Sequence, residues 1–223
     1  MYRLQTSDNI KKLLHSGRKL NLPKGQIVQS TDDRRVFNLI EAGYIKRYLI
    51  ANDGSLGVQV LYGPGDFFPI TLAFSAIFDQ TLNESPETYY YEAITPITIY
   101  TIDEANLRES AEKNPLLYKD LLAISGKRLH STLHGLENLT LSNSYRRVAH
   151  EIYNLGLRFG EKKSIGTIIK LQLTHQDIAD ILSVTRETVS TCMVQLRQKK
   201  LISTDKSHIT IKDMEKLKDE AYS

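Results

Sequence analysis

Residues 174–200 read THQDIADILSVTRETVSTCMVQLRQKK, and this stretch decides the class of fold. Thr174 is suited to cap a helix, and Asp177 stands three residues later, which makes a short-armed version of the capping box. After the Ser183-Val184 turn, Thr185 is suited to cap a second helix, whose apolar residues repeat at helical spacing. Two capped helices joined by a tight turn predict a helix-turn-helix.

A hairpin is predicted directly after this helix pair. Residues 201–204 and 209–211 read as strands, and they flank a polar, partly basic tip at residues 205–208. A helix pair alone also occurs in proteins that never touch nucleic acid. Helix, turn, helix and hairpin in that order are typical of a winged helix-turn-helix, so the sequence predicts double-stranded DNA as the partner.

The second helix carries the side chains that suit base readout. Its first turn presents Arg186 and Glu187, a donor fork beside a carboxylate acceptor, at the end that enters a major groove. An intrahelical charge pair is the alternative, but adjacent residues on a helix point about 100° apart and pair poorly. Thr174, Lys206 and His208 are expected to hold phosphates. The residues expected to touch DNA are Thr174, Gln176, Thr185, Arg186, Glu187, Ser190, Thr191, Lys206 and His208.

Residues from about Lys19 to Ile102 predict antiparallel strands. Segments such as 36–40, 44–50 and 58–62 are rich in β-branched and aromatic residues. Turn signals such as Gly63-Pro64-Gly65-Asp66 separate these segments at intervals that suit a barrel better than βαβ units. The sequence therefore predicts a small antiparallel β-barrel.

Helical periodicity replaces the strand pattern after Asp103, and an apolar seam with steps of four and three residues then continues for nearly three heptads. This seam predicts a dimerisation helix; the alternative is that its leucines pack on the chain's own barrel. A glycine inside a helix costs about 1 kcal/mol relative to alanine, so Gly126 suggests a close approach of two helices. The predicted dimer interface consists of Leu122, Gly126, Leu129, Leu133 and Leu136.

His130 and His134 lie four residues apart on this helix, a spacing that can hold a metal ion. No glutamate stands beside the first histidine, as it would in the helix of a zinc hydrolase, so both are predicted to be surface residues. Cys192 is the single cysteine, which excludes an internal disulfide and a multi-cysteine metal or iron-sulfur site. Neither a metal site nor a cofactor is predicted.

A third block begins near residue 142. Residues 142–144 can cap a helix over Tyr145–Leu157, which Gly160 ends. A charged link over 161–163 and an alternating strand over 168–173 follow.

The sequence thus predicts an α+β chain with three segments: an antiparallel β-barrel in residues 1–110, a dimerisation helix in 111–141 and a winged helix-turn-helix in 142–223. Within the first segment the strand pattern lapses, and residues 71–78 predict a short helix over the barrel.

Composition restricts the class of protein. Apolar runs are far shorter than the roughly 18 to 20 residues that a membrane span needs, and the N-terminus lacks the apolar stretch of a secretory signal. A cytoplasmic protein that does not enter a membrane is expected. From Ser142 onward the chain holds 14 Lys and Arg against 10 Asp and Glu. This excess of basic residues is weak evidence for nucleic-acid binding by itself, and it supports that function only together with a nucleic-acid-binding motif.

The chain resembles the Crp/Fnr family of bacterial transcription regulators. The resemblance covers nearly the whole chain, from the barrel with Gly63-Pro64-Gly65-Asp66-Phe67 through the long helix to residues 174–211, and Thr185–Ser190 is its most specific part. It implies a cyclic-nucleotide-binding-like sensor barrel, a homodimer through the long helix and a two-fold symmetric operator. It also implies RNA polymerase as a partner and no enzymatic activity.

Two departures from the family pattern matter. The member that binds cyclic AMP holds the phosphate and ribose with an Arg-Ser pair after a Gly-Glu step, whereas Glu87-Thr88 stand here where that pair would be. A carboxylate repels a phosphate, so the expected effector, if any, is an unknown small molecule other than cyclic AMP. Thr191 stands where the family usually has a second base-contacting Arg. The effector pocket is predicted to be lined by Phe67, Phe68, Glu87, Thr88 and Tyr90, unless these residues are simply barrel core.

Two functions from other classes compete with a DNA-binding regulator. A cupin-type barrel enzyme needs two or three histidines with a carboxylate on barrel strands, but His15 is the only histidine before His130. A ligand-binding barrel that regulates a partner protein would leave the winged segment superfluous.

Overall fold

The computed structural model describes residues 7–30, 36–50, 54, 56–70, 89–141, 143–205 and 208–222. The chain divides into two compact units, one over Leu4–His130 and one over Ser131–Ser223. The boundary falls inside the long helix α4 (Leu116–Leu141). The predicted division at residues 110 and 141 stays a prediction, and the short helix expected over residues 71–78 lies outside the described residues.

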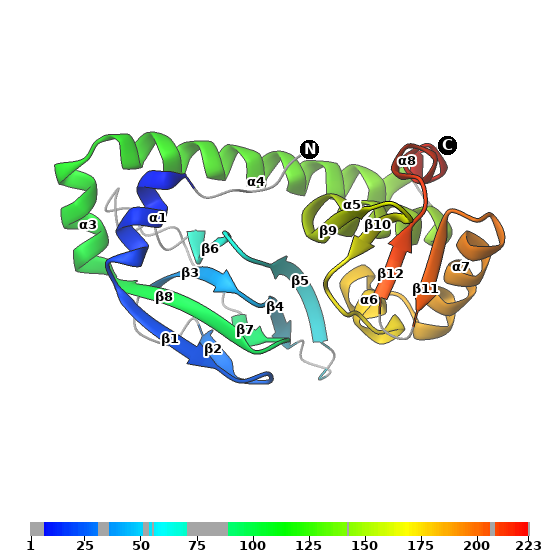
Figure 1. Cartoon of the computed structure of the whole chain (residues 1–223), viewed down its shortest axis with the longest axis horizontal. Helices are drawn as coiled ribbons and strands as arrows, with labels where there is room; N and C mark the ends of the chain where they lie inside the picture. The colour runs from blue at the N-terminus through cyan, green and yellow to red at the C-terminus, as the bar shows by residue number, and fades with distance from the viewer. Residues whose placement is uncertain are drawn as a thin grey trace. The chain divides into compact units, whose positions relative to one another are not determined.

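Strands fill the N-terminal unit and form two four-stranded antiparallel sheets (Figure 1). The first sheet has the order β1 (Arg18–Leu22), β8 (Ile97–Asp103), β3 (Val36–Ala42) and β6 (Phe67–Phe68). The second has the order β2 (Ile27–Ser30), β7 (Tyr89–Ala93), β4 (Ile45–Ile50) and β5 (Leu56–Tyr62). The antiparallel strands predicted between Lys19 and Ile102 are confirmed.

The two sheets share one hydrophobic core and therefore pack face to face. Ile40 and Phe68 of the first sheet belong to the same buried cluster as Tyr62 and Tyr91 of the second. The ring centroids of Phe68 and Tyr91 lie 5.0 Å apart across this core. Burial of these large aromatic rings from both sheets stabilises the sandwich.

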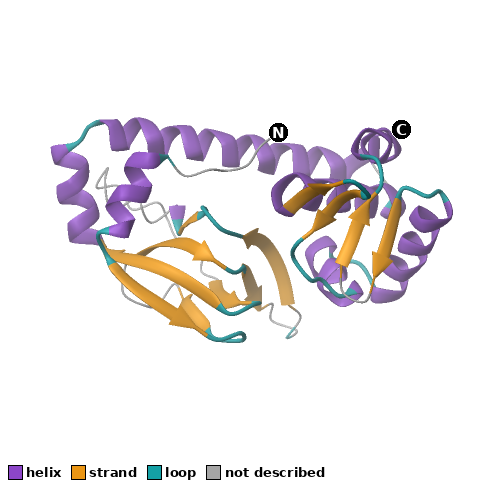
Figure 2. Ribbon diagram, viewed as in Figure 1, coloured by secondary structure: helices purple, strands orange, loops and turns teal. Residues whose placement is uncertain are grey.

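Three helices build a second core with the first sheet (Figure 2). They are α1 (Asp8–His15), α3 (Glu104–Lys113) and the beginning of α4. Leu14, Leu107 and Leu121 contribute one buried side chain from each helix. Asp103 caps α3, because its carboxylate accepts a hydrogen bond from the Asn106 N–H at 2.8 Å. The predicted change to helix after Asp103 is confirmed.

The C-terminal unit follows the predicted order of helix, strand, helix pair and hairpin. Its helices are α5 (Ser144–Phe159), α6 (His175–Leu182), α7 (Arg186–Gln198) and α8 (Met214–Tyr222). Its strands are β9 (Gly160–Lys163), β10 (Gly166–Ile169), β11 (Ile202–Asp205) and β12 (His208–Ile211), which form one antiparallel sheet in the order β11-β12-β10-β9. The winged helix-turn-helix is confirmed.

Two details of this unit differ from the sequence prediction. The charged residues 161–163, expected as a link, belong to β9, the strand at one edge of the sheet. Strands at the edge of a sheet often carry charged side chains, and a run of charged residues does not show the apolar pattern by which a strand is recognised in a sequence. The predicted strand over 168–173 is too long, because β10 ends at Ile169. Leu171 is buried beyond the strand, so the alternation of buried and exposed residues continues past the last ladder position.

Helix α5 packs closely on the sheet. A Cβ added to Gly156 would overlap Cδ1 of the buried Ile211 on β12, so a larger residue here would force that side chain to move. A hydrogen bond of 3.0 Å between the His150 ring and the Tyr222 hydroxyl joins α5 to α8. These contacts give α6 and α7 a fixed support.

Candidate nucleic-acid interface

Helix α6 starts at the predicted capping box. The Asp177 N–H donates to the Thr174 hydroxyl at 3.1 Å, and the Thr174 N–H donates to the Asp177 carboxylate at 2.7 Å. The helix ends at Ser183, which has a φ of 51° in the left-handed region. Local hydrogen bonds therefore fix both ends of the first helix.

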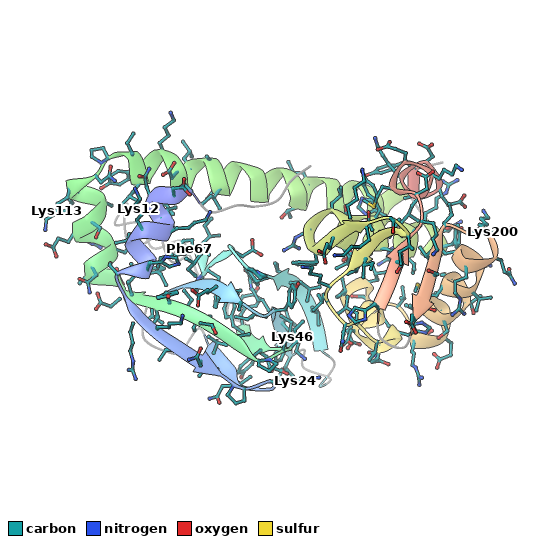
Figure 3. The ribbon with its side chains drawn as sticks, in the orientation of Figure 1. Lys12, Lys24, Lys46, Phe67, Lys113 and Lys200 are labelled. Carbon is teal, nitrogen blue, oxygen red and sulfur yellow. The ribbon has the colours of Figure 1, made fainter. Side chains whose placement is uncertain are left out.

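Helix α7 starts at Thr185, whose hydroxyl accepts a hydrogen bond from the Thr188 N–H at 3.2 Å. Its inner face is buried and carries Val189, Cys192, Met193 and Leu196. Arg186, Glu187 and Thr191 are exposed on the other side. The N-terminal end of the helix, which is predicted to read bases, is thus open to solvent. Lys200, labelled in Figure 3, lies just beyond the opposite end of α7.

Arg186 and Glu187 do not form the charge pair that was the alternative to base readout. Within the part of the chain that the structure describes, no ion pair includes either side chain. The guanidinium donor fork and the carboxylate acceptor both stand in the first turn of α7. This pair of groups matches the acceptors of guanine and the amino donor of cytosine.

The two hydroxyls predicted beside them already have partners inside the protein. The Thr191 hydroxyl donates to the backbone carbonyl of Glu187 at 3.0 Å, which leaves its oxygen only as an acceptor. The Ser190 hydroxyl lies 2.8 Å from Nδ1 of His175, the first residue of α6. Sequence reasoning missed His175, because its partner lies on another helix.

His175 lies in a positively charged environment. Burial, and then the charges of Arg197 and Arg186, hold the pKa of this histidine below its ordinary value of 6.5. The ring is therefore neutral at physiological pH, and its Nδ1 can accept as well as donate a hydrogen bond, depending on the tautomer.

The first turn of α6 offers fewer side-chain donors than predicted. The Thr174 hydroxyl and N–H both donate to the Asp177 carboxylate, each at 2.7 Å, so neither hydrogen points to a phosphate. The exposed Gln176 amide donates along the helix to Asp180 at 2.7 Å. The open N-terminal turn of the helix is the group that remains to face a phosphate here.

The wing is a short hairpin. Asp205 pairs with His208 and Ile202 with Ile211 in the β11–β12 ladder. His208 is half-buried at the start of β12, and the predicted phosphate contact Lys206 lies outside the described residues. Asp205 and His208, expected in the tip, are the last residue of β11 and the first residue of β12.

Comparisons with known proteins agree with this geometry. A family model described as a Crp-like helix-turn-helix domain matches residues 146–220. The CRP-like cAMP-activated global transcriptional regulator of Mycobacterium tuberculosis is 26% identical over 200 residues, which cover 89% of this chain and 85% of that protein.

Solved structures extend the likeness to both units. A CooA mutant from Carboxydothermus hydrogenoformans has a TM-score of 0.74 at 19% identity and covers 98% of this chain and 99% of its own. FixK2 from Bradyrhizobium japonicum also has a TM-score of 0.74 at 19% identity, over 91% of this chain and 96% of its own. Residues 146–220 thus form a Crp-like helix-turn-helix domain, and the chain as a whole is similar to DNA-binding transcription regulators of the Crp/Fnr type. The matched domain includes α7, the second helix of the helix-turn-helix.

Helix α4 carries the predicted dimer seam. Leu122, Leu129 and Leu133 are 65%, 61% and 49% exposed, so these leucines do not pack on the chain's own barrel. A Cβ added to Gly126 would meet nothing within 4 Å. The side chain of Leu136 lies outside the described residues. The opposite face of α4 packs inward through Leu117, Leu121 and Ile124.

The side chains of His130 and His134 on α4 also lie outside the described residues. Among the residues that are described, no group of three or more His, Cys, Asp or Glu could hold a metal ion. No described helix is long and apolar enough to cross a membrane.

Phe67, Phe68 and Tyr90, the predicted effector-pocket residues that the structure describes, do not pack in one cluster. Phe67, labelled in Figure 3, packs in the core below the helices, with its ring centroid 6.1 Å from that of Phe37. Phe68 packs in the core between the sheets, and Tyr90 stacks on Tyr48 at 5.5 Å. Neighbouring strand residues point to opposite faces, which separates Phe67 from Phe68. Glu87 and Thr88 lie outside the described residues.

Proposed function

We propose that the chain binds a two-fold symmetric DNA operator as a homodimer and reads its sequence with α7. The observation that carries this proposal is the first turn of α7, where Arg186 and Glu187 are exposed and not paired with each other, while the inner face of the helix is buried. A rigid helix with free donor and acceptor groups at its N-terminal end suits direct readout in a major groove.

Arg186 and Glu187 set the base preference in this proposal. The Arg186 guanidinium donates a bidentate pair of hydrogen bonds to guanine O6 and N7, and the Glu187 carboxylate accepts from the cytosine N4 amino group. Together they specify a G·C-containing step in each half-site. Thr191 adds at most a weak contact, since its hydrogen already binds the Glu187 carbonyl.

Phosphate contacts set the register of the protein on the duplex. The first turn of α6, from His175 to Gln176, directs backbone N–H groups and the positive end of the helix dipole toward one phosphate. Lys206 and His208 of the wing supply further contacts. These contacts strengthen binding to every sequence alike.

The dimer forms through the seam of α4. Leu122, Leu129 and Leu133 expose an apolar stripe to solvent, which is costly for a helix that has no partner. Gly126 leaves room on the same stripe for a close helix-helix approach, and Leu136 is the next residue of the predicted seam. A two-fold dimer places its recognition helices about one DNA turn, roughly 34 Å, apart.

The effector of this regulator differs from cyclic AMP. The Mycobacterium tuberculosis relative is described as cAMP-activated, but Glu87-Thr88 in this chain replace the Arg-Ser pair that holds the cyclic phosphate. The N-terminal sandwich therefore senses another small molecule or none. RNA polymerase is the expected protein partner, and the bacterial cytoplasm the expected location.

Random-site selection with the purified full-length chain, without added effector, tests the proposal. The expected product is an inverted repeat whose half-site centres lie about 34 Å apart. Selected sites without symmetry, or no enrichment of any sequence, would contradict it. The second result would instead favour a barrel module that regulates a protein partner.

A further inference from the structure

His175 and Ser190 connect the two helices of the helix-turn-helix at the DNA-facing end. Nδ1 of His175 on α6 lies 2.8 Å from Oγ of Ser190 on α7, and both side chains are half-buried. Ser190 stands one turn after Arg186 and Glu187, the residues proposed to read bases. A hydroxyl has one hydrogen, so the direction of this bond decides what Ser190 offers to a base.

We propose that His175 is a positioning residue that sets the hydrogen-bond direction of the Ser190 hydroxyl, so that uptake of one proton by His175 reverses the base preference of Ser190. This inference rests on the proposed function, because it concerns a contact that α7 makes in the major groove.

In the neutral ring the proposal assigns the proton to Nε2. Ser190 then donates its hydrogen to Nδ1, and only its oxygen lone pairs remain for DNA. These accept a hydrogen bond from the amino group of adenine N6 or cytosine N4. The neutral state therefore favours an amino base.

In the protonated ring both nitrogens carry a hydrogen, and Nδ1 donates to the Ser190 oxygen. The hydroxyl hydrogen is released from the ring and points toward the groove, where guanine O6 or thymine O4 accepts it. The proton comes from solvent, and no covalent bond of the protein changes. The protonated state favours a keto base.

The charges around His175 mean that its ring takes up a proton only below neutral pH. Burial, and then the charges of Arg197 and Arg186 on α7, hold the pKa of the ring below the ordinary 6.5. The N-terminal end of α6 acts in the same direction, because the helix dipole is positive there. A DNA phosphate beside this turn acts in the opposite direction and favours the protonated ring.

Two other charged groups, one on α6 and one on α5, form hydrogen bonds of their own. The Asp177 carboxylate, on the same helix, accepts hydrogen bonds from the N–H and the hydroxyl of Thr174. Arg147 of α5 donates to the Leu182 carbonyl, at the opposite end of α6 from His175. The two arginines of α7 are the charged groups that lower the pKa of the His175 ring.

The test compares affinities of the full chain for operators that carry each base pair at each half-site position, at about pH 8 and about pH 5.5. At one position the preference is expected to change from an amino base to a keto base, by about fivefold, the factor that one neutral hydrogen bond contributes. Ser190→Ala should remove the preference at that position at both pH values. His175→Ala should remove its pH dependence, and His175→Arg, a permanent donor, should favour the keto base at both pH values.

Two control variants separate this effect from other causes. Thr191→Ala removes the neighbouring hydroxyl, and His208→Gln removes the histidine of the wing; both should keep the pH response. If His175→Ala lowers the midpoint of thermal unfolding too far for binding measurements, His175→Gln provides the same test, because its amide does not titrate.

The possible failures are distinguishable. The role of His175 would be overturned if the unmodified protein had the same base preference at both pH values. It would also be overturned if the pH dependence of base preference persisted in His175→Ala. In both cases the Arg186-dependent preference for G·C would remain. Loss of every sequence preference would overturn the proposed function itself.

Discussion

Arg197, near the end of α7, donates a hydrogen bond from Nη1 to the Thr204 hydroxyl on β11 at a distance of 3.1 Å. The recognition helix and the first strand of the wing are therefore joined by their side chains as well as by the chain between them. This bond fixes the wing relative to the helix that we propose to read bases.

At about pH 8, where the His175 ring is neutral with or without the nearby charge, Arg197→Ala should weaken binding to all operator variants by the same factor, about twofold to tenfold, and leave base preference unchanged. The reason is that Arg197 orients the wing, which contacts phosphates, and does not read a base. Titrations of several operator sequences check this. Thr204→Val should have a similar effect, and the double variant should be no worse than Arg197→Ala. A changed base preference at about pH 8 would refute the assignment.

Arg186→Ala should cost about 1 to 3 kcal/mol of binding free energy and relax the preference at one base pair, because a bidentate contact to guanine is lost. Selection and competition binding measure both effects. Lys216→Ala on α8, which removes an exposed cation far from α7 in sequence, is the control and should change neither.

Lys206→Ala should instead weaken all sequences alike and reduce the slope of log affinity against log salt by roughly one, because one phosphate contact is lost. Affinities measured over a series of salt concentrations give this slope. An unchanged slope would show that Lys206 does not touch the backbone of the duplex.

Leu129→Glu combined with Leu136→Glu should convert the dimer to a monomer and strongly weaken operator binding, because charges at both positions would have to be desolvated in the seam. Sedimentation gives the mass in solution. Ala123→Glu, exposed on the same helix but off the seam, should remain dimeric. A dimer that survives both seam substitutions would place the interface elsewhere.

Cyclic AMP and cyclic GMP should show no binding at physiological concentrations, because the sequence resemblance puts Glu87 at the position where a cation would have to neutralise the phosphate. Calorimetric titration of the same preparation that binds the operator is the measurement. Micromolar affinity for either nucleotide would contradict this expectation.

Gly156→Ala should destabilise the C-terminal unit by about 1 to 3 kcal/mol, since the added methyl group would overlap Cδ1 of Ile211. Thermal unfolding followed by circular dichroism measures the loss. Gly57→Ala on β5, where the added carbon would lie at an ordinary 3.6 Å from Leu49, is the matched control. Equal unfolding midpoints for the two variants would contradict the close packing of α5 on β12.

The sequence by itself determined the elements whose signals are local. Thr174 with Asp177, and Thr185 with Thr188, are three residues apart, so the starts of both helices could be predicted from spacing alone. The seam of α4 was equally local, because its period is that of one helix. The same proximity made the order of helix, turn, helix and hairpin recognisable.

Tertiary structure alone decided the features that depend on residues far apart in the sequence. The charged strand β9 became visible only by its pairing with β10. Phe67 and Phe68, adjacent in sequence, separated into two cores because a strand points successive side chains to opposite faces. The hydroxyl of Ser190, predicted to be free for DNA, found His175 fifteen residues earlier. A hydrogen bond between two helices depends on how they cross, and that crossing is set by the packing of the whole domain and not by spacing along the chain.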